Sequence, residues 1–225
     1  ETPHDIFTRI GASFVFNNLS SAGRPCRYVS TATINITENG NLVMENCTLE
    51  MNSTSDDGQY DLIVGGGILT ANYSNITRAS TNNYDFFTDS SAATQVILKN
   101  SYVSYAGSAD SDNFRGLTLN TNNVTFQDNT LRSASNTLLE LGANGIIIER
   151  SIFNGGGATS YGIRARANDS IILDSNVSGN TLQNIRLVAK NNITLLNTNH
   201  TSESTTGANA SLFKQWYTDV RVIDS

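Results

Sequence analysis

Lysine, proline and cysteine are scarce in this sequence, and long apolar runs are missing. Of 225 residues only three are lysine (Lys99, Lys190 and Lys214), and the net charge is −6. No basic block is present that could neutralise a phosphate backbone, so nucleic-acid binding is not expected. The longest apolar runs, such as Ile146-Ile147-Ile148, are far shorter than the roughly 18 residues that a membrane-spanning helix needs, so no membrane span is expected.

Two cysteines, Cys26 and Cys47, are too few for a disulfide framework, and neither lies in a CxxC motif. A single disulfide, within one chain or between two, is the favoured interpretation and fits an oxidising compartment, while two unrelated buried thiols are the alternative. The chain begins with Glu1 rather than Met and carries no charged and apolar leader. We therefore expect a secreted protein of the cell surface or envelope, although a start inside a longer chain would look the same.

Small uncharged polar residues are abundant instead: the chain holds 29 asparagines and 50 serines and threonines, and 15% of its residues are charged. With 38% hydrophobic residues and two prolines, disorder is not expected. Such a composition favours a fold that uses amides and hydroxyls structurally.

A short apolar-x-apolar segment recurs along the whole chain every 22 to 28 residues. A period of two predicts strands whose first and third residues face inward. A second apolar-x-apolar unit precedes most copies, as in Ile34–Ile36 and Leu139–Leu141, and turn residues such as Asn39-Gly40 separate the two units. The copies begin at Phe14, Leu42, Ile68, Val96, Val124, Ile146, Ile171, Ile193 and Val220.

These repeats predict one all-β domain over residues 1–225, a parallel β-solenoid of about nine coils with no evident end caps. Five copies carry asparagine at their fifth position, which predicts a ladder of amides bonded from coil to coil and sequestered from solvent. The ladder residues are Asn18, Asn46, Asn72, Asn100 and Asn197.

The coils at Asn123–Thr130 (NVTFQDNT) and Asn144–Phe153 (NGIIIERSIF) resemble those of right-handed parallel β-helix proteins of the pectate-lyase-like superfamily. The resemblance covers nearly the whole chain and implies a right-handed solenoid, but enzymes, adhesins and envelope proteins share it. In composition the chain is also similar to β-helix proteins of archaeal S-layers and sheaths.

Polysaccharide-active members of that superfamily carry carboxylates, with Arg or Lys in lyases, on the outer face of one sheet. The strand formed by the second apolar-x-apolar unit of each repeat has an outward row. This row is expected to contain Asn35, Asp61, Thr118, Glu140, Arg164, Arg186 and Lys214. Glu140, Arg164 and Arg186 follow one another there and favour a solvated charge ladder over a catalytic site. Glu149 and Asp174, one coil apart on the other outward row, could form an acid/base pair. Neighbouring Gln127 and Leu196 supply no cation or second acid, so catalysis is not favoured there.

No metal site or cofactor is expected. The loop acids Asp56-Asp57, Asp85 with Asp89 and Asp110 with Asp112 do not follow the order of a calcium-binding loop. His4 and His200 are too far apart in the repeat for a zinc site or a catalytic triad.

Twelve N-x-S/T sequons suggest glycosylation of a secreted chain. The acceptors expected in corners or loops are Asn52, Asn75, Asn199 and Asn209, followed by Asn123 and Asn192. Apolar residues also recur at the second position of the copies, which faces outward. Strand propensity alone explains part of this pattern, and a stripe for lateral assembly explains the rest. The stripe consists of Val15, Val43, Leu69, Ile97, Ile147 and Ile172.

The favoured function is a non-catalytic, glycosylated subunit of an extracellular layer, sheath or filament. It would bind copies of itself through open solenoid ends, where strand edges are unpaired, and through the apolar stripe. The alternative is a polysaccharide lyase or hydrolase, or a glycan-binding adhesin whose partners are cell-surface glycans, acting around Glu140, Arg164 and Arg186.

Overall fold

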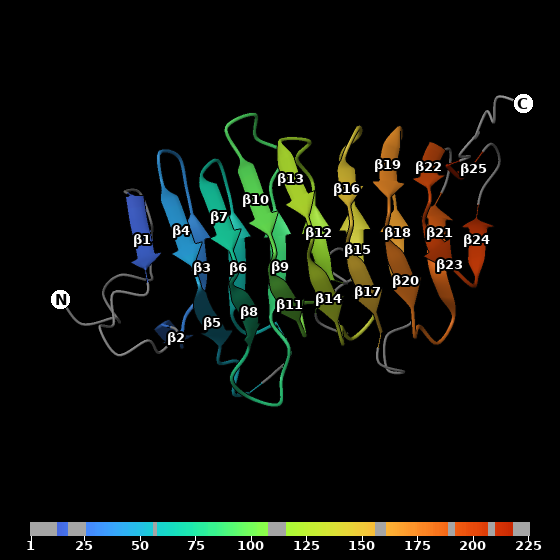
Figure 1. Ribbon diagram of the computed structural model, residues 1–225. Coiled ribbons are helices and arrows are strands. Elements are labelled where there is room, and N and C mark those ends of the chain that lie inside the picture. Colours follow the sequence, from blue (N-terminus) through green and yellow to red (C-terminus); the bar gives the residue numbers. More distant parts are fainter. Residues whose placement is uncertain are drawn as a thin grey trace, which may run out of the picture.

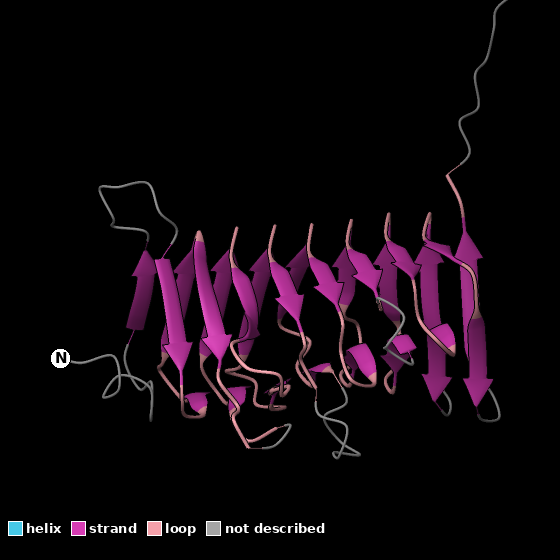
Figure 2. Ribbon diagram, turned by 90° about the horizontal axis from the view of Figure 1, so that it is seen from below, coloured by secondary structure: helices cyan, strands magenta, loops and turns pink. Residues whose placement is uncertain are grey.

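The protein is a right-handed parallel β-solenoid, as predicted (Figure 1). A computed structural model describes residues 13–17, 26–55, 58–107, 116–155, 161–188, 192–206 and 210–217, with the backbone alone for 13–17. Every regular element in these residues is a strand. The coils stack side by side from the N-terminal to the C-terminal end, and the strands form three parallel sheets along the rod (Figure 2).

The first sheet contains the strands that the repeat search found. Its nine strands, in spatial order, are β1 (Ser13–Asn17), β4 (Asn41–Glu45), β7 (Ile68–Asn72), β10 (Gln95–Lys99), β13 (Val124–Gln127), β16 (Ile147–Glu149), β19 (Ser170–Leu173), β22 (Asn192–Leu196) and β25 (Ser211–Gln215).

Eight strands form the second sheet, and each of those from β5 onward follows a strand of the first sheet after a corner of one or two residues. They are β2 (Cys26–Ser30), β5 (Cys47–Met51), β8 (Asn75–Arg78), β11 (Tyr102–Ser104), β14 (Thr130–Arg132), β17 (Ile152–Asn154), β20 (Asn176–Ser178) and β23 (Asn199–His200).

The third sheet also has eight strands and completes each coil. They are β3 (Ile34–Ile36), β6 (Asp61–Val64), β9 (Asp85–Thr88), β12 (Leu117–Leu119), β15 (Thr137–Leu141), β18 (Tyr161–Ala165), β21 (Gln183–Val188) and β24 (Glu203–Thr206).

The described strands thus make eight successive triplets followed by β25, slightly fewer complete coils than the nine predicted. The ninth strand of the first sheet is Ser211–Gln215, where Leu212 pairs with Ile193. The copy predicted at Val220 lies outside the described residues.

Two of the predicted copies were placed one residue out of register. Leu42 pairs with Leu69 rather than Ile68, and Ile148 pairs with Ile172 rather than Leu173. Leu69 and Ile172 are therefore inward and fully buried, so their assignment to an outer stripe is wrong. Each segment has apolar neighbours on both faces, and a slip of one residue exchanges the faces of a strand.

The interior is a continuous column of apolar side chains contributed by all three sheets. Alternation puts Ile34, Leu42 and Leu49 inside in one coil, each with no exposed surface. The rings of Phe126 and Phe153 stack with centroids 6.1 Å apart across two coils. Burying one such side chain contributes about 1.5–3 kcal/mol, which supports a rod that has no helical layer in its described part.

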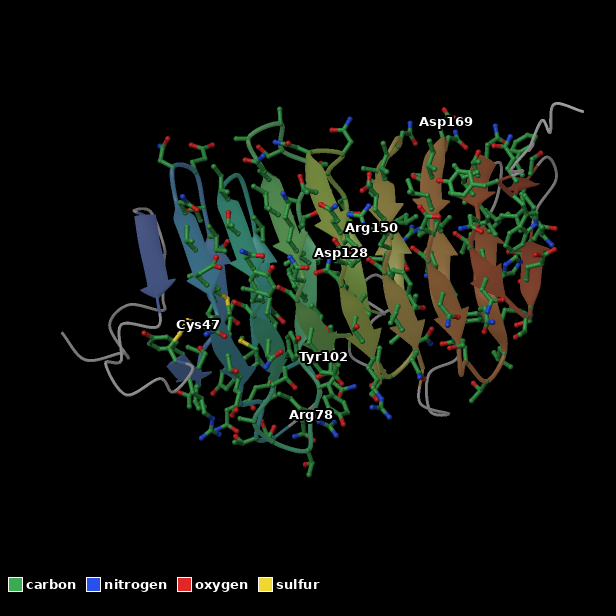
Figure 3. The ribbon with its side chains drawn as sticks, in the orientation of Figure 1. Cys47, Arg78, Tyr102, Asp128, Arg150 and Asp169 are labelled. Atoms are coloured by element: carbon green, nitrogen blue, oxygen red, sulfur yellow. A yellow bond between two sulfur atoms is a disulfide. The ribbon has the colours of Figure 1, made fainter. Side chains whose placement is uncertain are left out.

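The corner between the first and second sheets is one residue in the left-handed backbone conformation. Its φ angles lie between 44° and 56°, a region that asparagine and aspartate tolerate better than most residues. The corner residues are Asn46, Tyr73, Asn100, Asp128, Arg150, Asp174 and Asn197. In Figure 3, Arg150 and Asp128 reach toward each other from adjacent coils, and Nε of Arg150 lies 2.9 Å from Oδ1 of Asp128.

The predicted asparagine ladder is wrong in its position. Asn46, Asn100 and Asn197 are exposed corner residues, and Asn72 ends β7 one residue before its corner. Asn100 donates to the amide oxygen of Asn72 at 3.3 Å, in an exposed position. Asn18 lies outside the described residues.

A buried ladder of mainly hydroxyl side chains lies one residue after the corners. The backbone N–H of each member donates to the side-chain oxygen of the next: Ser74 to Ser101 at 3.2 Å, Ser101 to Asn129 at 2.9 Å and Asn129 to Ser151 at 3.2 Å. The ladder runs through Cys47, Ser74, Ser101, Asn129, Ser151 and Ser175. Its side-chain oxygens accept hydrogen bonds from buried backbone N–H groups that follow the corners, between strands of the two sheets.

Cys26 and Cys47 form a disulfide within one chain, in register on β2 and β5, with Cα atoms 4.7 Å apart. The bridge joins two adjacent coils at the N-terminal end, where Figure 3 shows the sulfur atoms near the Cys47 label. The disulfide is compatible with an oxidising compartment. Among the described residues, no helix is long and apolar enough to cross a membrane.

Candidate functional site

The row expected around Glu140 exists on the outer face of the third sheet, but with different members. Glu140, Arg164 and Arg186 are in register on β15, β18 and β21, as expected. Asp61 pairs with Asp85 in a neighbouring row, and Lys214 lies on β25 of the first sheet. The observed row is Asn35, Ile63, Phe87, Thr118, Glu140, Arg164, Arg186 and Ser204.

The solvated charge ladder predicted for this row is wrong, because Glu140 is 1% exposed. Its Oε2 lies 2.8 Å from Nη1 of Arg164 and its Oε1 lies 3.0 Å from Nη1 of Arg166. Arg186 stacks over the ring of Tyr161, 4.6 Å from its centroid. A carboxylate that is buried and bonded through both oxygens is not accessible to a polysaccharide, so Glu140 is not suited to act as a catalytic acid or base.

Glu149 and Asp174 do not form a pair. Glu149 is in register with Leu173, and Asp174 is the corner residue that follows it. Oε2 of Glu149 lies 3.3 Å from Nη1 of Arg150, whereas Oδ1 of Asp174 accepts a hydrogen bond from Asn197 at 2.7 Å. Glu149 is therefore paired with its neighbour in the chain, and Asp174 takes part in a hydrogen bond between two coils.

Asp61 and Asp85 form a pair of carboxylates, although Asp61 was expected in a strand and Asp85 in a loop. They are in register on β6 and β9, and both are on the outer face of the third sheet. Partial burial, together with the charge of Asp85, raises the pKa of Asp61 to about 6. On the same sheet, a pocket of about 450 Å³ is lined by residues that include Phe87, Asp89 and Asn120. Raised carboxyl pKa values are typical of general acids.

No group of histidine, cysteine, aspartate or glutamate that could hold a metal ion occurs among the described residues. Asp89 accepts hydrogen bonds from the Ser91 N–H, at 3.1 Å, and from the Thr94 hydroxyl. Asp56-Asp57, Asp110, Asp112 and His4 lie outside the described residues. Asp89 therefore stabilises the turn that follows β9.

The outer face of the first sheet carries an uncharged row along the rod. Val43, Ile97 and Ile147 belong to it as predicted, and Ile147 is 44% exposed. Thr70 and Ile171 replace the buried Leu69 and Ile172, and the side chain of Val15 lies outside the description. The outer row is Val43, Thr70, Ile97, Thr125, Ile147, Ile171, Thr194 and Phe213.

Most of the expected glycosylation acceptors are accessible. Asn75, Asn123, Asn192 and Asn199 are exposed, and Asn52 is half-buried. Asn209 lies outside the described residues. Asn176, also in a sequon, is exposed and in register with Asn199 on the outer face of the second sheet.

The last described coil carries charges where earlier coils carry core residues. His200, Glu203 and Lys214 are in register with Val177, Ile185 and Leu195. His200 Nε2 lies 2.6 Å and Lys214 Nζ 2.7 Å from the two carboxylate oxygens of Glu203. Partial burial opposes ionisation of Glu203, but these two hydrogen bonds outweigh it and lower its pKa. These three side chains lie together on the last described strands of the solenoid.

No protein-family model matches the chain, and no curated protein or solved structure is significantly similar to it. The fold type, a parallel β-solenoid, does not by itself indicate a function.

Proposed function

We propose that the protein is a non-catalytic, secreted structural subunit that assembles with its own copies into an extracellular layer, sheath or filament. The uncharged outer row of the first sheet carries this proposal. Its aliphatic members and threonines extend over eight neighbouring strands without one charged residue, on a chain with 34 charged residues. A flat, uncharged row on a rigid sheet suits contact with a second rod.

The ends of the rod support assembly less well than the outer row of the first sheet does. Among the described strands, β1 and β25 each have one neighbour in the first sheet. The charged trio His200, Glu203 and Lys214 makes the C-terminal end costly to bury against an apolar surface. Lateral contact through the first sheet is therefore the primary mode in this proposal.

Light scattering and electron microscopy of concentrated protein test the proposal. Ile147→Lys puts a charge into the middle of the uncharged row and should abolish the assemblies. Thr130→Lys, on the half-buried outer face of the second sheet, is the matched control and should leave them intact. A wild-type protein that stays monomeric at high concentration, or equal behaviour of the two variants, contradicts the proposal.

A second function, hydrolysis of a polysaccharide, is favoured by the Asp61–Asp85 pair alone. Two carboxyl groups on neighbouring strands suit the short separation used by retaining glycosidases, roughly 5–5.5 Å, and the raised pKa of Asp61 suits a general acid. Sugar release from neutral and acidic polysaccharides, lost in Asp61→Asn and kept in Asp169→Asn at an exposed turn, would establish this activity in place of the structural role.

A further inference from the structure

A pocket lies at the C-terminal end of the rod, beside the charged trio. Its volume is about 350 Å³, and its lining residues come from β23 to β25 and the adjoining turns: Asn199, His200, Thr201, Ser202, Glu203, Lys214 and Trp216. Trp216 is the only tryptophan of the chain, and 60% of its surface is exposed. An indole this exposed is unusual, since tryptophan is highly buried on average.

The pocket combines an aromatic wall with balanced polar groups. The carboxylate of Glu203 is bonded to both His200 and Lys214, so no unpaired charge of that trio faces the pocket. The Ser202 hydroxyl and the Asn199 amide add neutral hydrogen-bonding groups to the lining. A pyranose ring has a matching surface, because its C–H face is apolar and its rim carries hydroxyl groups.

The same pocket contains a complete glycosylation sequon, Asn199-His200-Thr201. Asn199 is exposed at an outward position of β23, while His200, its side chain 8% exposed, takes the inward position next to it. The acceptor amide and the exposed indole therefore line one cavity, which no other described sequon shares.

We propose that Asn199 carries an N-linked glycan and that the first pyranose of this glycan occupies the pocket against Trp216. This proposal rests on the proposed secretion of the chain. Nδ2 of Asn199 attacks the anomeric carbon of a lipid-linked sugar phosphate, the co-reactant. A C–N bond forms, the C–O bond to the phosphate breaks and the phosphate leaves with the electron pair. The amide proton passes to a base of the transferase.

The attached sugar covers the exposed indole beside the last described strands of the solenoid. The neighbouring sequon at Asn176 provides a matched comparison, because its side chain occupies the same row one coil earlier. Asn176 is not part of the pocket lining, so a glycan there has no contact with Trp216 to make.

The test uses the full chain secreted from a host that N-glycosylates. Glycopeptide mass spectrometry should find Asn199 occupied. Fluorescence reports on the pocket alone, since Trp216 is the sole tryptophan, and its emission should shift to longer wavelength in Asn199→Gln and after enzymatic deglycosylation. Asn176→Gln should leave the emission unchanged. In Trp216→Ala, Asn199 should remain occupied while the NMR signals of its first sugar narrow to those of a mobile glycan.

An unoccupied Asn199, or an emission spectrum that Asn199→Gln leaves unchanged, overturns the proposal. Quenching of Trp216 by free N-acetylglucosamine in a protein with unoccupied Asn199 also overturns it, because the pocket then takes sugar from another source. Light scattering of Asn199→Gln tests the structural function separately. If this variant still assembles, the proposed structural function remains supported whatever the result for the glycan.

Discussion

Glu140 and Arg164 form an ion pair, 2.8 Å from Oε2 to Nη1, that joins two neighbouring coils on the outer face of the third sheet. The side chain of Glu140 is 1% exposed and that of Arg164 is 12% exposed. Both faces of β15 are buried over Thr137–Leu141, so this pair lies in a shielded part of the rod. An outward position in the strand alternation is thus not equivalent to a solvent-exposed one.

Replacing Glu140 by glutamine should destabilise the protein strongly. The substitution leaves two arginines without their carboxylate, and breaking one partner out of a buried pair costs about 3–5 kcal/mol. Urea unfolding followed by circular dichroism measures the loss. Glu149→Gln, which removes a partly exposed carboxylate paired with Arg150, should change stability by less than about 1 kcal/mol. Equal effects of the two substitutions would show that the burial of Glu140 has no energetic consequence.

The hydroxyl ladder gives a second prediction, at Ser151. Its Oγ accepts the N–H of Asn129 at 3.2 Å and donates to the carbonyl of Glu149 at 2.7 Å, and the residue is fully buried. Ser151→Ala leaves the Asn129 N–H without its side-chain acceptor, so we expect a loss of about 1–3 kcal/mol in urea unfolding. Thr125→Ala, at an outward position of the first sheet, should be close to neutral. A neutral Ser151→Ala would mean that the ladder does not stabilise the corners.

The solenoid could be predicted from the sequence because alternate burial leaves a period of two in every coil. Register could not be predicted at Ile68-Leu69 and Ile171-Ile172, where an apolar residue lies on each face and only pairing with the next coil decides between them. The hydroxyl ladder had a signal in the sequence, since Ser74, Ser101 and Ser151 each follow a corner residue by one position.

The C-terminal pocket was missed for a different reason. Lys214 was assigned to the third sheet and the last repeat to Val220, whereas Leu212 and Lys214 occupy the inward register of the ninth strand. A charged residue at an inward position contradicts the apolar pattern that defined the repeat. Lys214 lies on the last described strand of the first sheet, where it pairs with Leu195 and no described strand follows.

The Cys26–Cys47 bridge should stabilise the N-terminal end without changing the oligomeric state. The bridge lies within one chain and closes a loop with a sequence separation of 21, for which about 2–4 kcal/mol is typical. The double variant Cys26→Ala, Cys47→Ala should lose this amount in urea unfolding, and added reductant should leave its stability unchanged. Non-reducing and reducing gels of the wild type should show the same chain mass. A disulfide-linked dimer would contradict the intrachain pairing.

The pH dependence of stability should carry the signature of Asp61. Its pKa is raised to about 6 in the folded protein, above the roughly 3.9 of an unfolded aspartate, so the folded state binds the additional proton between these values. The contribution of this group is therefore most favourable below about pH 4 and is lost as the pH rises through 6. Asp61→Asn removes the cost of partly burying a charged carboxylate and the repulsion from Asp85, and should stabilise the protein at pH 7 by about 1 kcal/mol, a value reduced for solvent screening.

Urea unfolding of the wild type and Asp61→Asn at pH 4 and at pH 7 measures this difference directly. The two proteins should differ most at pH 7 and converge near pH 4, because a protonated aspartate and an asparagine are both neutral. Asp89→Asn is the control, at the loop residue that follows β9. Its carboxylate accepts hydrogen bonds from Ser91 and Thr94, so its replacement should destabilise the protein. A stability difference between wild type and Asp61→Asn that does not change with pH would contradict the raised pKa and, with it, the basis for a general acid on this face.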